Sequence, residues 1–175
     1  MAFPSLSIGD LTAKMPIVQG GMGVGISLSG LASAVANQGG IGVIAGAMIG
    51  MKEPDVAKNP IEANLRALRQ ELTKAREKTQ GIIGVNIMVA LTTFSQMVRT
   101  AIENRADIIF SGAGLPLEMP KHLLQACEEK KEEFKTKLVP IVSSARAATL
   151  IARKWLSRFD YLPDAFVVEG PKAGG

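Results

Sequence analysis

Short apolar segments recur along the chain and alternate with segments whose apolar residues repeat at helical spacing. Most of the short segments are apolar at nearly every position, as in strands that are covered on both faces of a parallel sheet. They span residues 16–22, 41–48, 82–89, 107–114, 138–144 and 165–168. The pattern predicts an α/β fold with parallel strands.

Amphipathic segments between these strands predict five helices. The first is expected to begin at Ser27 or Ser29 as its N-cap and to end before Gly39. Its predicted inward face consists of Leu31, Ala34 and Val35. The second runs from about 60 to 80, begins at Asn59-Pro60 and carries a Glu62–Arg66 pair.

Strict alternation of strands and helices leaves two architectures open. One is an open, doubly wound sheet, and the other is a (β/α)8 barrel, which needs eight strands and about 250 residues. The chain has 175 residues and six predicted strands. The sheet is therefore either open or the first part of a longer barrel.

Glycine and small polar residues gather where the predicted strands end. In a parallel fold these ends meet on one face, and glycine lets a flat ligand approach the backbone closely. The pattern predicts a platform for a heteroaromatic cofactor. The strand ends are Gln19-Gly20-Gly21-Met22, Gly46, Asn86, Ser111-Gly112, Ser143-Ser144 and Glu169-Gly170.

Composition excludes several other classes of protein. Apolar residues make up 47% and charged residues 21%, which is typical of a globular domain. The net charge of +4 comes from lysines and arginines interleaved with glutamates, so we expect no nucleic-acid partner. Cys127 is the only cysteine, and no Cys/His cluster predicts a metal site. We expect no membrane span and no signal peptide, and a cytoplasmic location.

Few titratable residues offer chemistry of their own. The one histidine, His122, is predicted to be a solvent-exposed residue of a charged helix. Glu169 is either a general base or a residue that holds the loop 170–175 by hydrogen bonds. Lys172 is expected to be exposed. No Ser-His-Asp set, P-loop or pair of carboxylates appears, so a cofactor would have to carry the difficult chemistry.

Five motifs occur in a fixed order between about residue 8 and the last residue. They are Pro16-Ile-Val-Gln-Gly-Gly-Met-Gly, Gly39-Gly-Ile-Gly-Val-Ile, Gly84-Val-Asn-Ile, Gly114-Leu-Pro and Val168-Glu-Gly-Pro-Lys-Ala-Gly-Gly. Together they resemble the nitronate monooxygenase (2-nitropropane dioxygenase-like) family. Its near relative is the flavin-dependent enoyl-acyl-carrier-protein reductase.

The resemblance implies a (β/α)8 TIM barrel that binds FMN at the C-terminal strand ends. This chain would supply about six strands, so that residues 1–175 are the N-terminal part of a single domain, incomplete at its C-terminus. The implied FMN-binding residues are Gly21, Met22, Gly23, Asn86, Ser143, Gly170, Gly174 and Gly175. In the family a histidine follows the last glycine pair, so the catalytic residue is expected beyond Gly175 and is assigned to no residue of this chain.

The resemblance further implies an FMN-dependent nitronate monooxygenase that oxidises alkyl nitronates with dioxygen. An alternative within the class is a reductase that uses NAD(P)H on an enoyl thioester. An alternative of another class is an inactive barrel fragment that acts only in assembly. Because unclosed parallel strands leave two open edges, we expect self-association through these edges.

Overall fold

The computed structural model describes residues 3–170, 172 and 173. Its centre is a five-stranded parallel sheet in the order β3-β4-β5-β6-β7, so neighbours in the sheet are neighbours in the chain. The strands are β3 (Gly42–Ala45), β4 (Ile83–Met88), β5 (Ile108–Gly112), β6 (Lys137–Val142) and β7 (Val167–Val168). Sequential parallel order is that of a β/α barrel, and the predicted α/β class is confirmed.

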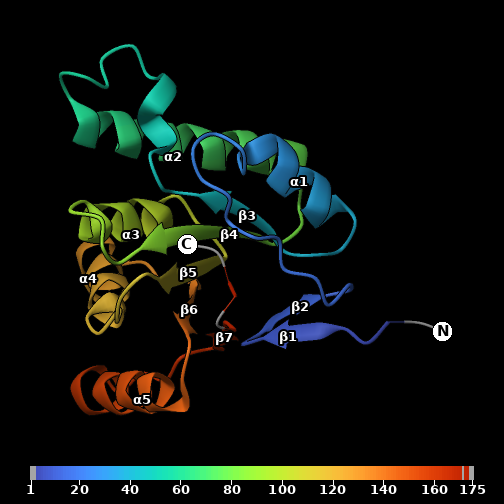
Figure 1. Ribbon diagram of the computed structural model, residues 1–175, viewed down its shortest axis with the longest axis vertical. Coiled ribbons are helices and arrows are strands. Elements are labelled where there is room, and N and C mark those ends of the chain that lie inside the picture. Colours follow the sequence, from blue (N-terminus) through green and yellow to red (C-terminus); the bar gives the residue numbers. More distant parts are fainter. Residues whose placement is uncertain (1–2, 171, 174–175) are drawn as a thin grey trace.

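Helices cover the outer face of the sheet (Figure 1). They are α1 (Ser29–Asn37), the 3-10 helix η1 (Ile49–Lys52), α2 (Pro60–Lys78), α3 (Phe94–Glu103), α4 (Met119–Lys130) and α5 (Ala145–Phe159). Ile83, Val85 and Ile87 of β4 alternate toward this face and join one core with helix residues such as Met97 and Trp155. None of the helices in the described residues combines the length and apolar composition needed to cross a membrane.

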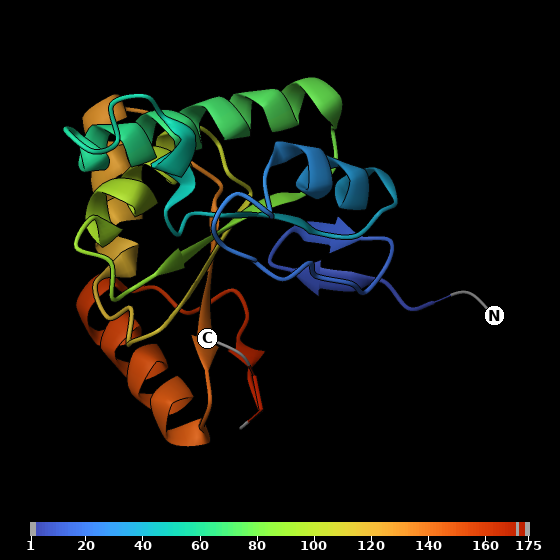
Figure 2. The same ribbon diagram turned by 45° about the horizontal axis from the view of Figure 1, so that its top comes forward.

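A hairpin, β1 (Leu6–Ile8) and β2 (Leu11–Ala13), lies on the other side of the sheet from α3 and α4 (Figures 1 and 2). Ile8 and Ala13 pack with Val43, Phe110 and Val139 in a second core on the inner face. The sequence pattern predicted no strand before residue 16. The strands are three residues each, too short for a clear alternating pattern, and their burial depends on the distant inner face.

The prediction of a buried strand at residues 16–22 is wrong. Only Val18 pairs with the sheet, through an isolated parallel bridge to Ile41. Ile17 is 54% and Val18 38% exposed. Among the described residues, this segment has a neighbouring strand on one side only. Its backbone groups on the other side are unpaired, and its side chains on that side are not covered.

The buried face of α1 also differs from the prediction. Leu31 and Ala34 are exposed, whereas Ala32, Ser33 and Ala36 are buried. The reason is the close approach of helix and strand, since a Cβ atom at Gly42 of β3 would lie 1.9 Å from the Ala32 carbonyl oxygen. Only small side chains fit between the two elements at this distance.

The helix termini show smaller differences. Leu28, not a serine, stands at the N-cap of α1, and the Ser29 N–H donates instead to Glu71 Oε2 of α2, at 2.9 Å. In α2, which begins at Asn59-Pro60 as predicted, the expected Glu62–Arg66 pair does not form. Arg66 instead reaches back to Glu53, at 2.7 Å, and to Asp55, while Glu62 pairs with Arg69. The tertiary position of the segment before α2 decides these partners.

Candidate functional site

The loop of residues 20–26 crosses the C-terminal ends of β3 and β4. A Cβ atom at Gly21 would lie 2.5 Å from Cβ and 2.8 Å from Cγ of Asn86 on β4. A Cβ atom at Gly23 would lie 3.5 Å from Cβ of Ala47, just beyond β3. The structure thus brings together Gly21 and Asn86, two predicted cofactor-binding residues that are far apart in the chain.

Asn86 offers an unused amide group beside this loop. It is half-buried and shares the inner face of β4 with Gly84, two residues earlier. Its carbonyl oxygen accepts a hydrogen bond from the Gly46 N–H at 2.8 Å, which holds the backbone in place. No hydrogen bond joins its side chain to any residue that the structure describes. A ligand at this strand end would meet both an N–H donor and a C=O acceptor.

The loop also presents backbone donors. Within the described residues, the N–H groups of Gly21, Gly23 and Gly25 make no hydrogen bond to protein atoms, whereas the Met22 N–H is bonded to Ser27. Free amides of this kind can donate to an electron-rich heteroatom or an anion.

The glycines serve two distinct purposes. At Gly84 and Gly112 a Cβ atom would lie within 3.0 Å of Phe110 and Ile141, so close packing excludes a side chain. At Gly20 and Gly170 no atom lies within 4 Å of the Cβ position, and neither glycine has a positive φ. Gly23 meets only Ala47, at ordinary contact distance. At these three positions the space beside the backbone is left open.

The remaining predicted site residues are less closely grouped. Ser143 follows β6 and is exposed, and the next residue, Ser144, caps α5 by accepting from the Ala147 N–H at 3.2 Å. Gly170 follows β7 and is exposed. No contact joins either of them to Gly21 or Asn86 in the described residues. Gly174 and Gly175 lie outside the described residues.

Glu169 and Lys172 lie beyond β7, where both are exposed, as expected for Lys172. The backbone N–H of Glu169 donates to the Val142 carbonyl oxygen at 2.9 Å, which extends the pairing of β6 and β7. Its carboxylate makes no hydrogen bond to the residues described. Neither of the two roles predicted for this carboxylate is tested by these contacts.

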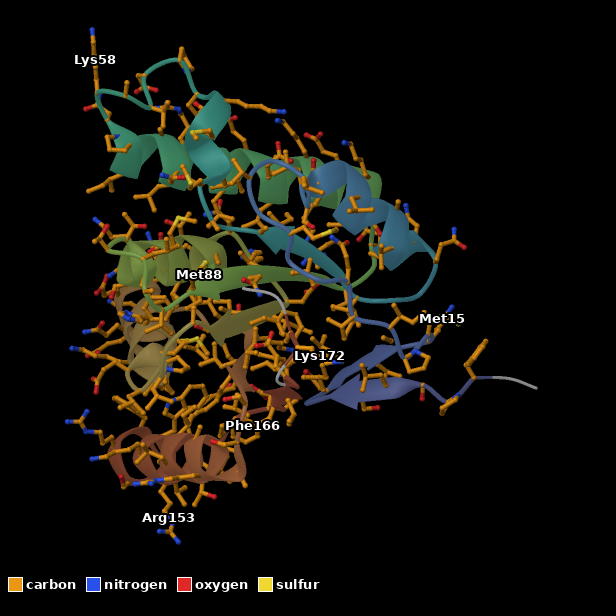
Figure 3. The ribbon with its side chains drawn as sticks, in the orientation of Figure 1. Met15, Lys58, Met88, Arg153, Phe166 and Lys172 are labelled. Atoms are coloured by element: carbon orange, nitrogen blue, oxygen red, sulfur yellow. The ribbon has the colours of Figure 1, made fainter. Side chains whose placement is uncertain are left out.

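Three methionines give the rim of the site an apolar character. Met22 in the loop, Met48 after β3 and Met51 in η1 are each nearly half exposed. Met48 has a φ of 51°, a left-handed conformation that is uncommon for a residue with a side chain. A fourth, Met88, lies at the end of β4 (Figure 3).

Two residues that hold the loop were missed as site residues. Ser27 was predicted as a helix cap, yet it is fully buried under the loop and bonded to Gly20 and Met22. Gln19 was noted only as a polar strand end, and its side chain bonds Ser27 and Val43. A polar residue within an otherwise apolar or glycine-rich stretch was the available signal, because buried polar groups need partners.

His122 is not the solvent-exposed residue that was predicted. It is half-buried between α3 and α4, with its ring edge-on to Phe94 and the centroids 6.4 Å apart. Burial lowers the pKa of His122, with smaller contributions from Lys121 and Arg99. The sequence could not show the packing of α4 on α3 that covers it. It makes no contact with the loop 20–26.

Two grooves in the described residues lie at the opposite end of the sheet. One, of about 390 Å³, is lined by residues 12–14, 36–40 and 80–82, and the other, of about 280 Å³, by residues 10–11, 105–107 and 133–136. Both are at the N-terminal ends of the strands. Ligands of parallel α/β folds bind at the C-terminal ends, so the loop 20–26 and Asn86 remain the candidate site.

Comparison with known proteins gives a consistent picture. The family model described as nitronate monooxygenase matches residues 5–175. FabK from Thermotoga maritima is 28% identical, with a TM-score of 0.65 over 91% of this chain and 42% of its own. A nitroalkane oxidase from Streptomyces ansochromogenes, 19% identical with a TM-score of 0.64, matches over 91% of this chain and 47% of its own, and shows the fold alone.

The chain spans less than half the length of these solved structures. No curated protein matches the sequence. The fold is that of TIM-barrel enzymes, of which the described strands form one half.

Proposed function

The chain belongs to the nitronate monooxygenase family, and from this premise we propose that it contributes the FMN platform of an oxidoreductase that oxidises alkyl nitronates with dioxygen. The family and the solved neighbours support a flavin-type oxidoreductase. The observation that carries the proposal is the contact between Gly21 and Asn86, which sets a glycine backbone beside an unpaired amide at the strand ends.

The residues of this site fit a flavin on chemical grounds. A planar ring system needs open space beside the backbone, which Gly20, Gly23 and Gly170 leave free. The ring heteroatoms need both donors and acceptors. The carboxamide of Asn86 supplies both, and the free N–H groups of the loop supply further donors.

Each residue then has a defined part. FMN, when bound, supplies the electron transfer from substrate to dioxygen. Gly23 admits the ring, Gly21 lets the loop approach Asn86 closely, Met22 packs against the ring from the loop, and Asn86 orients it. Ser143, Gly170 and the glycines 174 and 175 complete the proposed FMN-binding set. The proton-transfer group is assigned to the histidine that follows Gly175 in the family.

An enoyl-thioester reductase that uses NAD(P)H is the second candidate. Met22, Met48 and Met51 give the rim an exposed apolar surface, which suits a hydrocarbon chain better than a small nitronate. Dioxygen uptake on addition of a nitronate supports the monooxygenase. Flavin bleaching by NAD(P)H that a crotonyl-type thioester reverses supports the reductase instead.

The first experiment is a visible absorption spectrum of the purified protein, with the released cofactor identified. Flavin bands and released FMN are expected. The variant Asn86→Ala should bind FMN about 3- to 10-fold more weakly at nearly unchanged stability, because the amide has no protein partner to lose. A colourless protein that takes up no added FMN would refute FMN binding by this chain and favour an inactive fragment that acts in assembly.

A further inference from the structure

Ser27 is fully buried, and its hydroxyl group lies at the base of the loop 20–26. Its Oγ accepts hydrogen bonds from the Met22 N–H and from Gln19 Nε2, both at 3.0 Å, and donates to the Gly20 carbonyl at 3.1 Å. The Ser27 N–H also donates to the Met22 carbonyl at 3.0 Å. Both backbone groups of Met22 are therefore held by one residue.

Gln19 ties this arrangement to the sheet. Its Nε2 donates to the Val43 carbonyl at 3.0 Å, and its Oε1 accepts from the Val43 N–H at 3.3 Å. In a parallel ladder these two groups would pair with the neighbouring backbone. The backbone pairing here ends with the Gln19 N–H and the Ile41 carbonyl, at 3.0 Å. The Gln19 side chain therefore makes the two hydrogen bonds to Val43 that the backbone of the next residues would make if they continued in the sheet.

We propose that Gln19 and Ser27 are positioning residues that hold the loop 20–26 in its ligand-binding shape above Asn86. Gln19 replaces the main chain in the sheet, which frees residues 20–23 to cross the strand ends. Ser27 bonds both backbone polar groups of Met22, while the N–H groups of Gly21, Gly23 and Gly25 are left for a ligand. This inference rests on the proposed FMN site and names residues that act through the loop.

Helix α1, which follows the loop, provides a matched control. Ser33 of α1 is also buried, and its hydroxyl group donates to the Ala75 carbonyl at 3.4 Å. It makes no hydrogen bond to the loop. Replacing Ser33 removes a buried serine hydroxyl without touching the loop. Ser27→Ala removes the hydroxyl that bonds the Met22 N–H, the Gly20 carbonyl and Gln19 Nε2, and it leaves the Met22 N–H with the Gly20 carbonyl alone, at 3.1 Å.

The test compares Ser27→Ala, Gln19→Glu and Ser33→Ala in the full chain. Amide hydrogen exchange at residues 20–26 is measured first, without FMN. We expect Ser27→Ala and Gln19→Glu to raise exchange at Met22 severalfold, because the Met22 N–H loses its Ser27 acceptor in the first variant and Ser27 loses its Gln19 donor in the second. Ser33→Ala should leave this exchange unchanged. FMN affinity, measured by flavin fluorescence, and the visible spectrum of bound FMN should change in the same two variants only.

The two readouts separate this inference from the proposed function. Unchanged exchange at Met22 in both loop variants, or an equal change in Ser33→Ala, overturns the positioning role. If Ser27→Ala fails to fold, the exchange at Met22 in Gln19→Glu tests the role, since this variant keeps the side-chain shape while it replaces both donations from Nε2 by a carboxylate oxygen that cannot donate. If the unaltered chain binds no FMN, the proposed function fails, and exchange alone still decides whether Gln19 and Ser27 hold the loop.

Discussion

At the scale of single residues, the glycines of this chain are not interchangeable. Gly21 touches Asn86, Gly42 touches α1, and Gly20 touches nothing within 4 Å of its Cβ position. In sequence all three lie in similar glycine-rich stretches near strand ends. Their different roles follow from which element lies opposite, and they lead to different expectations on substitution.

Gly21→Ala should weaken FMN binding about tenfold or more and destabilise the fold by about 1–3 kcal/mol, since the new Cβ overlaps Asn86. The matched control is Gly20→Ala, which meets no atom and has no positive φ. Fluorescence titration with FMN and urea unfolding measure the two effects. Equal behaviour of the two variants would contradict the placement of Gly21 against Asn86.

At the scale of elements, the packing of α1 on β3 depends on the absence of a side chain at Gly42. Gly42→Ala should cost about 3 kcal/mol, the upper end of overpacking, because its Cβ would overlap the backbone of Ala32. Gly30→Ala in α1 meets no atom and should instead stabilise by up to about 1 kcal/mol through helix propensity. Thermal unfolding of the pair measures this, and a neutral Gly42→Ala would refute the close approach.

The docking of the β1–β2 hairpin should depend on pH. Asp10 in its turn pairs with Lys137 at 2.7 Å, and the hydrogen bond to Lys137 lowers the pKa of Asp10 below its ordinary value of 3.8. A lowered pKa means that the pair stabilises the fold above pH 3.8 and that this contribution disappears as the pH falls through the lowered value.

The measurement is the urea midpoint of the unaltered chain and of Asp10→Asn at pH 6 and at successively lower pH, down to about 2. The two proteins should differ at pH 6 and converge as Asp10 becomes protonated. A difference that persists at the acid end would show that the pair is not the source.

At the scale of the whole molecule, apolar side chains are exposed along both edges of the sheet. One edge carries Ile17 and Val18. The other carries Leu162 and Val168, the latter 74% exposed, beside β7. Each edge strand also offers unpaired backbone groups, which favours association with another chain.

We expect the 175-residue chain to self-associate as its concentration rises, because edge pairing would bury these apolar groups. The double variant Leu162→Lys and Val168→Lys should shift the association to higher concentration. Leu124→Lys, at an exposed leucine of α4 away from both edges, is the control. Light scattering across a concentration series decides. A chain that stays monomeric at all concentrations and unfolds cooperatively would contradict association through the unpaired edge strands.

Much of the fold was predictable because it depends on local pattern. Continuous apolar runs marked β3 to β7, and apolar residues at helical spacing marked the five helices between the predicted strands. The hairpin and the inward face of α1 were not predictable. Their burial depends on contacts with β5, β6 and Gly42, which no local window contains.

The sequence by itself determined the α/β class, the order of strands and helices, and the gathering of glycines at the strand ends. Those properties follow from periodicity and backbone freedom, which are local. Only the tertiary structure decided that Gly21 lies on Asn86, that Gln19 and Ser27 hold the loop between them, and that 16–22 pairs through one bridge. These depend on which distant residues become neighbours, and neighbours are set when the sheet assembles.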